Sequence, residues 1–307
     1  MNEEDHVEGA EHEPMRDLEL EHSKLKGDIE LVRNYGEAHP DAWVDLWIEN
    51  EPSVRIVVVF VGNDVDDHEA TLRSLVAHPD QLEIHRSDRY SRAYLEGIEV
   101  KVRQMATTAE RGSFRSWGIG RGRLNVNVQA ARKELAQLLL ESYGDAVKLR
   151  VGFLSYPDPM MNDTDMPRRS APVPERPPLL PAQEIWVSVD DGLEVRSGEH
   201  LQSVLHIHND GPSEIVVLTN GAVTARVVDP QTEVVVGGYE FAQTMPGIQY
   251  GVAPRGSAEV PLLVGTASTN PLLGYCVPPG RRAIEVSLNL EDRGVFRTPL
   301  LPIEVVD

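Results

Sequence analysis

The chain has 307 residues, which is long for one average domain and suits two. Its hydrophobic content of 41% is ample for packed cores and excludes a wholly disordered protein, and its formal net charge of −20 excludes binding to nucleic acid through phosphates. The single cysteine excludes an intramolecular disulfide and a cysteine zinc cluster. Because no apolar run reaches the length of a membrane span and the acidic start does not fit a signal peptide, we expect a cytoplasmic protein with no membrane partner.

The first 34 residues are strongly acidic. Residues 1–30 hold eleven Asp or Glu against three Lys or Arg. Like charges at this density resist packing, so we expect residues 1–15 to be disordered. Apolar residues scattered through residues 16–34 allow a helix there. Residues 1–34 are therefore interpreted as an acidic tail with a possible helix.

Residues 35–156 show one pattern twice: strand, strand, helix, strand. The predicted elements are strands at 43–49 and 55–61, a helix between Asp64 and Pro79, a strand at 82–85, a helix at 94–105, strands at 114–119 and 123–128, a helix at 130–143 and a strand at 147–154. The helix at 94–105 joins the two units. Since neither unit has three well-covered strands alone, we expect both to share one core. The prediction is an α+β domain built from a duplicated ββαβ unit.

Two stretches of this domain carry a resemblance to a known family. They are residues 42–48 followed by 55–61, and residues 116–119 followed by 123–128, each a hairpin with tryptophan in its first strand. This domain resembles the pro-region repeat of bacterial secreted serine proteases of the α-lytic protease and streptogrisin type. The resemblance implies a domain that binds a protein partner, in part by presenting a sheet edge. The sequence contains neither the Gly-Asp-Ser-Gly nor the Ala-Ala-His-Cys motif of such a protease.

The remaining chain is predicted to be a linker and an all-β domain. Residues 157–184 hold eight prolines, which is typical of a semi-rigid spacer. From 185 to 307, short apolar segments alternate with turn signals such as Asn220-Gly221 and Gly237-Gly238, with no convincing helix. About 120 residues with some eight strands indicate an antiparallel sandwich, and the segment resembles a bacterial immunoglobulin-like β-sandwich domain.

Two tryptophans are candidate binding residues. Trp43 and Trp47 lie on one predicted strand, and partial alternation places them on one side together with Asp45. Tryptophans are more often core residues than ligand platforms. If this pair is exposed, it would be the best anchor for a partner or a sugar.

Two histidines form a second candidate site. His206 and His208 are two residues apart on a predicted strand, so both side chains point to the same face. They could coordinate one metal ion together if Asp210 or His200 supplied a third ligand. The simpler interpretation is that they lie on the wet face of a strand whose core residues are Leu205 and Ile207.

Three further motifs are interpreted as structural. A catalytic Cys276 would need a positioned histidine, so a small buried or half-buried residue in a turn region is the better interpretation. The acidic run at 64–67 lacks the calcium-loop pattern and fits helix capping. The glycines at 118, 120 and 122 close a hairpin rather than open a helix, so they do not indicate a dinucleotide site.

These features favour a non-enzymatic protein-binding or adaptor protein with no catalytic residue, cofactor or metal. Two alternatives stay open. One is a sugar- or small-molecule-binding β-sandwich, which requires an exposed aromatic side chain among Trp186, Tyr239, Phe241 and Tyr250. The other is an enzyme with a site at the domain interface that includes His206 and His208.

Overall fold

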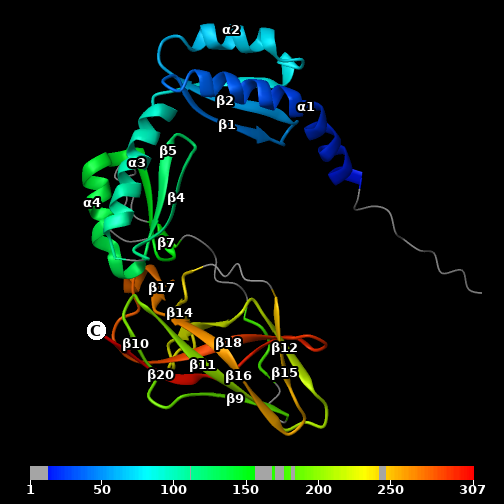
Figure 1. Ribbon diagram of the computed structural model, residues 1–307, viewed down its shortest axis with the longest axis vertical. Helices are drawn as coiled ribbons and strands as arrows, with labels where there is room; N and C mark the ends of the chain where they lie inside the picture. The colour runs from blue at the N-terminus through cyan, green and yellow to red at the C-terminus, as the bar shows by residue number, and fades with distance from the viewer. Residues whose placement is uncertain (1–12, 111, 156–167, 170–175, 181–183, 242–246) are drawn as a thin grey trace, which may run out of the picture. The chain divides into compact units, whose positions relative to one another are not determined.

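The structure is a computed structural model that describes residues 13–110, 112–155, 168–169, 176–180, 184–241 and 247–307 (Figure 1). Its internal contacts divide the chain into two compact units. Unit 1 comprises residues 1–107 and 118–125, and unit 2 comprises residues 108–117 and 126–307. This division cuts through the predicted domain of residues 35–156. Of residues 1–15, which we expected to be disordered, 1–12 lie outside the described residues, whereas 13–15 belong to a helix that ends at Ala38.

Unit 1 is a small α/β structure with one three-stranded sheet. Its main elements are α1 (Glu13–Ala38), β1 (Trp43–Glu49), β2 (Arg55–Val61), α2 (Val65–Leu75), β3 (Leu82–Ser87) and α3 (Arg92–Thr108). β2 is the central strand, antiparallel to β1 and parallel to β3. Buried residues of α1 and α2, among them Leu25 and Leu72, pack in one core with Ile56, Val58 and Phe60 of β2. The two helices therefore cover the same face of the sheet.

A β-bulge in β1 separates the two tryptophans. The register with β2 shifts between Trp43 and Asp45, so the regular alternation of side chains is interrupted there. Trp43 consequently belongs to the core under the helices, whereas Trp47 is paired with Val57 on the opposite face. The prediction that Trp43, Asp45 and Trp47 share one side is wrong, because one extra residue reverses the face of everything that follows it.

Gly36 allows α1 to lie on Trp43. A Cβ atom on Gly36 would fall 2.3 Å from Cδ2 of Trp43 and 2.5 Å from its Cε2. Only glycine lets the helix backbone approach the indole ring this closely. The glycine in mid-helix thus reflects packing against the sheet.

Asp28 of α1 ties down the chain that follows α2. Its carboxylate accepts hydrogen bonds from the backbone N–H groups of Ala77 at 2.8 Å and His78 at 3.0 Å, and contacts Nδ1 of His78 at 2.8 Å. Burial would raise the pKa of Asp28, but the hydrogen bonds from Ala77 and His78 outweigh it and hold the pKa below its usual value. At the other end of α2, Asp64 occupies the N-cap position but makes no side-chain capping bond, so the predicted capping role is wrong for that residue.

A second α/β region follows. It contains β4 (Phe114–Gly120), β5 (Arg123–Val128), α4 (Lys133–Tyr143), β6 (Val147–Val151), β7 (Leu154–Ser155) and β8 (Arg168–Arg169), with sheet order β4-β5-β6-β7-β8. Strand, strand, helix, strand thus recurs in the order predicted, while the duplication itself stays a prediction. One shared core was expected, but β1–β3 form a separate sheet whose core is closed by α1. The long helix α1 covers a face of the β1–β3 sheet that the strands alone would leave exposed.

The C-terminal region is a large multi-strand β structure. Its strands are β9 (Ile185–Val189), β10 (Glu194–Arg196), β11 (His200–Asn209), β12 (Ile215–Thr219), β13 (Val223–Val228), β14 (Val235–Gly238), β15 (Ile248–Val252), β16 (Gly256–Gly265), β17 (Ala267–Ser268), β18 (Gly280–Leu290), β19 (Gly294–Arg297) and β20 (Leu301–Val306). The main order is β10-β20-β18-β13-β16-β11-β9. Alternating residues of these strands, such as Leu205 and Ile207 of β11, form one apolar core. Within the described residues from 184 onward, the only helical piece is a 3-10 turn at Pro271–Leu273.

The end of the proline-rich segment belongs to this β structure. Arg176 donates to the buried carboxylate of Glu285, with Nε 3.0 Å from Oε1, and Leu180 is part of the apolar core. Arg297 lies 3.4 Å from the same carboxylate. Residues 176–180 are therefore not a free spacer, because an apolar residue and a bidentate arginine attach them. Most of the predicted linker lies outside the described residues.

Candidate functional site

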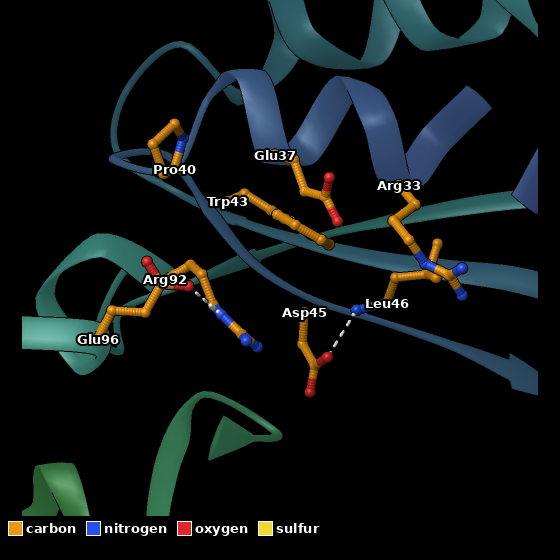
Figure 2. A pocket seen from close by; sticks show the side chains of 8 residues that line it. All are labelled: Arg33, Glu37, Pro40, Trp43, Asp45, Leu46, Arg92 and Glu96. Carbon is orange, nitrogen blue, oxygen red and sulfur yellow. Dashed lines mark hydrogen bonds and ion pairs between the residues drawn. The ribbon is translucent and has the colours of Figure 1, made fainter. Parts of the chain in front are cut away.

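Strand β1 lines a pocket on each of its faces. The first, the helix-side pocket, has a volume of about 480 Å³ (Figure 2). It is lined by Arg33, Glu37, Pro40, Trp43, Asp45, Leu46, Arg92 and Glu96. Figure 2 shows Trp43 beneath α1, with Arg92 and Asp45 reaching toward the same space. All of these residues belong to unit 1.

The helix-side pocket is lined by both positively and negatively charged side chains. Arg92 is paired with Glu96, with Nε 2.9 Å from Oε1, and Asp45 Oδ1 accepts the backbone N–H of Leu46 at 2.9 Å. Its lining residues include no serine, cysteine, histidine or lysine, so the described pocket contains no nucleophile paired with a base. It presents polar contact points and no catalytic arrangement.

Trp43 is a core residue at the floor of this pocket. It is 8% exposed, and its Nε1 is buried without a hydrogen-bond partner among the described residues. A buried donor of this kind usually costs about 1–3 kcal/mol. Trp43 therefore forms the buried floor of the pocket and is not the exposed binding residue that the sequence left open. Trp47 is half-buried and lines the other pocket.

The second pocket, which we call the arginine pocket, has a volume of about 330 Å³. It is lined by Val44, Asp45, Trp47, Glu49, Val59, Ser87, Arg89 and Arg121. Val44, Trp47 and Val59 give it an apolar wall, and Arg89 and Arg121 bring two guanidinium groups. Arg121 comes from the turn between β4 and β5, which the contacts assign to unit 1.

The carboxylates of the arginine pocket already have hydrogen-bond or ion-pair partners, whereas the guanidinium groups of Arg89 and Arg121 have no carboxylate partner among the described residues. Asp45 Oδ2 accepts the backbone N–H of Arg121 at 2.5 Å, and Glu49 is paired with Arg55 at 2.7 Å. The guanidinium groups of Arg89 and Arg121 form no ion pair with a carboxylate among the described residues. Sequence reasoning missed both arginines. The available signal was arginine in a Gly-Arg-Gly turn, where asparagine is the usual residue.

His206 and His208 lie on the outer face of β11 and alternate with the buried Leu205, Ile207 and Asn209. Their neighbours differ. Nε2 of His206 is 3.2 Å from Asp190, and the ring of His208 stacks on Trp186 with centroids 3.5 Å apart. Among the described residues, no group of three or more potential metal ligands is present. The structure thus places both histidines on the predicted face and gives each a separate partner.

The aromatic side chains of the β structure differ in exposure. Trp186, on the edge strand β9, is 45% exposed, and its Nε1 donates to Asp210 at 3.1 Å. Tyr239, Phe241 and Tyr250 are half-buried. The exposed aromatic residue required by the sugar-binding alternative is therefore present at Trp186.

A buried ionisable cluster in unit 2 was not expected from the sequence. Glu240 is 6% exposed, its Oε1 accepts the backbone N–H of Ala130 at 3.2 Å, and its Oε2 lies 3.6 Å from Nη1 of Arg115. Burial raises the pKa of Glu240 to about 7, although Arg115 and the Ala130 N–H act in the opposite direction. Nearby, burial raises the pKa of Cys276 to about 11, so this thiol stays protonated at neutral pH. A nucleophilic cysteine needs the opposite shift.

Comparisons with known proteins give only weak structural likenesses. The chain matches no protein-family model and no curated protein. Among solved structures, red sea bream transglutaminase is 10% identical with a TM-score of 0.25, over 40% of this chain and 16% of that one. The PapD-like domain 7 of human CEP192 is 13% identical with a TM-score of 0.20, over 45% of this chain and 95% of that one. The fibronectin(III)-like modules of Clostridium thermocellum CbhA are 11% identical with a TM-score of 0.16, over 39% and 93%.

Each of these likenesses has a TM-score of 0.25 or lower, so no conclusion about fold or function follows from them. The chain spans less than a third of the length of the transglutaminase. The comparisons give no support to the resemblance to protease pro-regions. Across the described part of the chain, no helix combines the length and apolarity that crossing a membrane requires.

Proposed function

We propose that the chain is a non-enzymatic binding protein whose unit 1 recognises an extended segment of a protein partner along the free edge of β1. The single observation that supports this most is the position of β1. It pairs only with β2 among the described residues, and its residues line both pockets of unit 1. An extended peptide added to such an edge gains main-chain hydrogen bonds, while pockets on the two faces receive alternate side chains.

The accessible part of this edge is short. The turn at Arg121 and Gly122 contacts β1 at Val44 and Asp45, which leaves residues 46–49 for an added strand. β3 is the other edge of the sheet, but the two pockets are built on β1. We therefore assign recognition to β1.

The test begins with selection of a random peptide library on the full chain. Selected peptides are then measured by calorimetry against wild type, Trp47→Pro and Ile48→Pro. Successive N–H groups of a strand point to opposite edges, so one proline removes an outward N–H and the other breaks a bond to β2.

Thermal unfolding identifies which of the two variants keeps its fold. We expect that variant to lose peptide binding at least tenfold. Matched prolines at Ile84 and His85 of β3, read in the same way, should leave binding unchanged. Full binding by the folded β1 variant, or failure to select any peptide, would overturn the proposal.

A second candidate function rests on Trp186. Its exposed indole on the outer face of the β structure suits stacking against the apolar face of a sugar ring. Titration with neutral oligosaccharides, monitored by tryptophan fluorescence in wild type and Trp186→Ala, tests it. A saturable change in wild type that is absent in the variant supports this function, and no change in wild type excludes it for those sugars.

A further inference from the structure

The arginine pocket contains two arginines that form no ion pair with a carboxylate among the described residues. Asp45 and Glu49 are occupied by the Arg121 N–H and by Arg55, while the guanidinium groups of Arg89 and Arg121 have no carboxylate partner among the described residues. This is unusual in a chain with a formal net charge of −20, where acidic partners are abundant. Guanidinium groups without a carboxylate partner have N–H donors that an anion can accept.

Local packing brings the two arginines to the same place. A Cβ atom on Gly122 would lie 3.4 Å from Cδ of Arg89 and 3.0 Å from Cγ1 of Val44. The aliphatic part of Arg89 therefore lies against the residue that follows Arg121. Arg89 is further anchored by its backbone N–H, which donates to Oγ of Ser87 at 3.0 Å. Both arginines line the same pocket.

Arg121 is held in a backbone conformation that does not favour arginine. Its φ is +51°, and that of Gly122 is +71°, as a two-residue hairpin turn of type I′ requires. Asparagine and glycine adopt the left-handed region readily, whereas a long side chain is strained there. Strain of this kind at a pocket points to a role for the side chain itself.

We infer that the arginine pocket binds a carboxylate side chain of the extended segment that β1 recognises, an inference that rests on the proposed function. A guanidinium group donates two parallel N–H bonds to the oxygens of a carboxylate, which gives a bidentate pair. A carboxylate fits better than a phosphate because Asp45 and Glu49 also line the pocket, and their negative charges oppose a doubly charged ligand more strongly. Trp47 packs the aliphatic part of the bound side chain.

The test uses small probes that carry no strand. Sodium glutarate, inorganic phosphate and neutral glutaramide are titrated at constant ionic strength into the full chain, and the indole N–H signal of Trp47 is followed by NMR. We expect a saturable shift with glutarate, weaker binding of phosphate and no effect of glutaramide. Arg121→Gln and Arg89→Gln should each weaken glutarate binding at least fivefold, because each removes one guanidinium. Arg103→Gln on α3, an exposed arginine outside the pocket, is the matched control.

The outcomes separate this inference from the proposed function. If glutarate produces no saturable shift, or binds Arg121→Gln as tightly as wild type, the inference fails even when selected peptides still bind. Tighter binding of phosphate than of glutarate would overturn the carboxylate assignment. If glutarate binds and no peptide does, the anion preference of the pocket stands, while the proposed function and the assigned partner fail. Unfolding curves of both glutamine variants establish that the fold is intact.

Discussion

Asp45 accepts a hydrogen bond from the backbone N–H of Arg121 at 2.5 Å, which joins β1 to a turn 76 residues later in the chain. The bond fixes the turn beside the sheet and neutralises none of the Arg121 guanidinium charge, because it uses the main chain. It thereby holds the side chain of Arg121 at the arginine pocket.

Replacing Arg121 should raise stability and weaken binding. Asparagine adopts the positive φ of this position more easily than arginine, so we expect Arg121→Asn to stabilise the fold by roughly 1 kcal/mol in urea unfolding. The same variant should lose affinity for glutarate and for acidic peptides. A variant that is less stable than wild type would show that the side chain of Arg121 is structural.

The two glycines of α1 should respond in opposite directions to alanine. Gly36→Ala places a Cβ atom 2.3 Å from the Trp43 ring, so we expect it to destabilise the fold by about 1–3 kcal/mol. Gly27→Ala meets nothing within 4 Å and should stabilise the helix by roughly 1 kcal/mol. Thermal unfolding of the two variants side by side measures both effects. Equal effects would contradict the close packing of α1 on Trp43.

Glu240 should make unit 2 less stable as the pH rises. Its pKa is about 7 in the folded chain against an ordinary 4.5, so its contribution is fully present below pH 4.5 and is lost as the pH rises to about 7. The difference corresponds to a contribution on the order of 3 kcal/mol. Glu240→Gln stays neutral at every pH.

We therefore expect wild type and Glu240→Gln to be similar at pH 4.5, and the variant to be the more stable at pH 8. Urea unfolding at the two pH values measures this difference, in which the titration of other groups cancels. A variant less stable than wild type at pH 8 would mean that the ionised carboxylate is stabilised by Arg115 more than burial opposes it.

Arg176 should anchor residues 176–180 through Glu285. The carboxylate of Glu285 is fully buried, so Arg176→Ala leaves it with Arg297 at 3.4 Å as its remaining arginine. We expect a loss of about 3 kcal/mol in urea unfolding, because an undercompensated charge stays buried. Adding Glu285→Gln to Arg176→Ala should restore most of the loss. A double variant no more stable than Arg176→Ala would indicate that packing, rather than charge, attaches this segment.

Local patterns in the sequence were sufficient for most elements, and the site depended on details that they do not contain. Alternating apolar residues identified β5 and β11 correctly, and the turn at Gly120-Arg121-Gly122 was predicted at the right position. The bulge after Trp43 could not be predicted, because one extra residue in a strand does not change its composition. The bulge nevertheless reverses the face of every later side chain in the strand. Arg89 and Arg121 line one pocket only through the tertiary fold, and the sequence around either residue does not indicate the other.

The most direct test of the central claim is residue-resolved amide hydrogen exchange of the full chain, with and without a saturating selected peptide. We expect exchange of alternate residues between Leu46 and Glu49 to slow at least tenfold on binding, because only their outward N–H groups gain new partners. The amides of β3 should keep their rates. Protection along β3, or unchanged exchange along β1 with the peptide bound, would contradict recognition at the β1 edge.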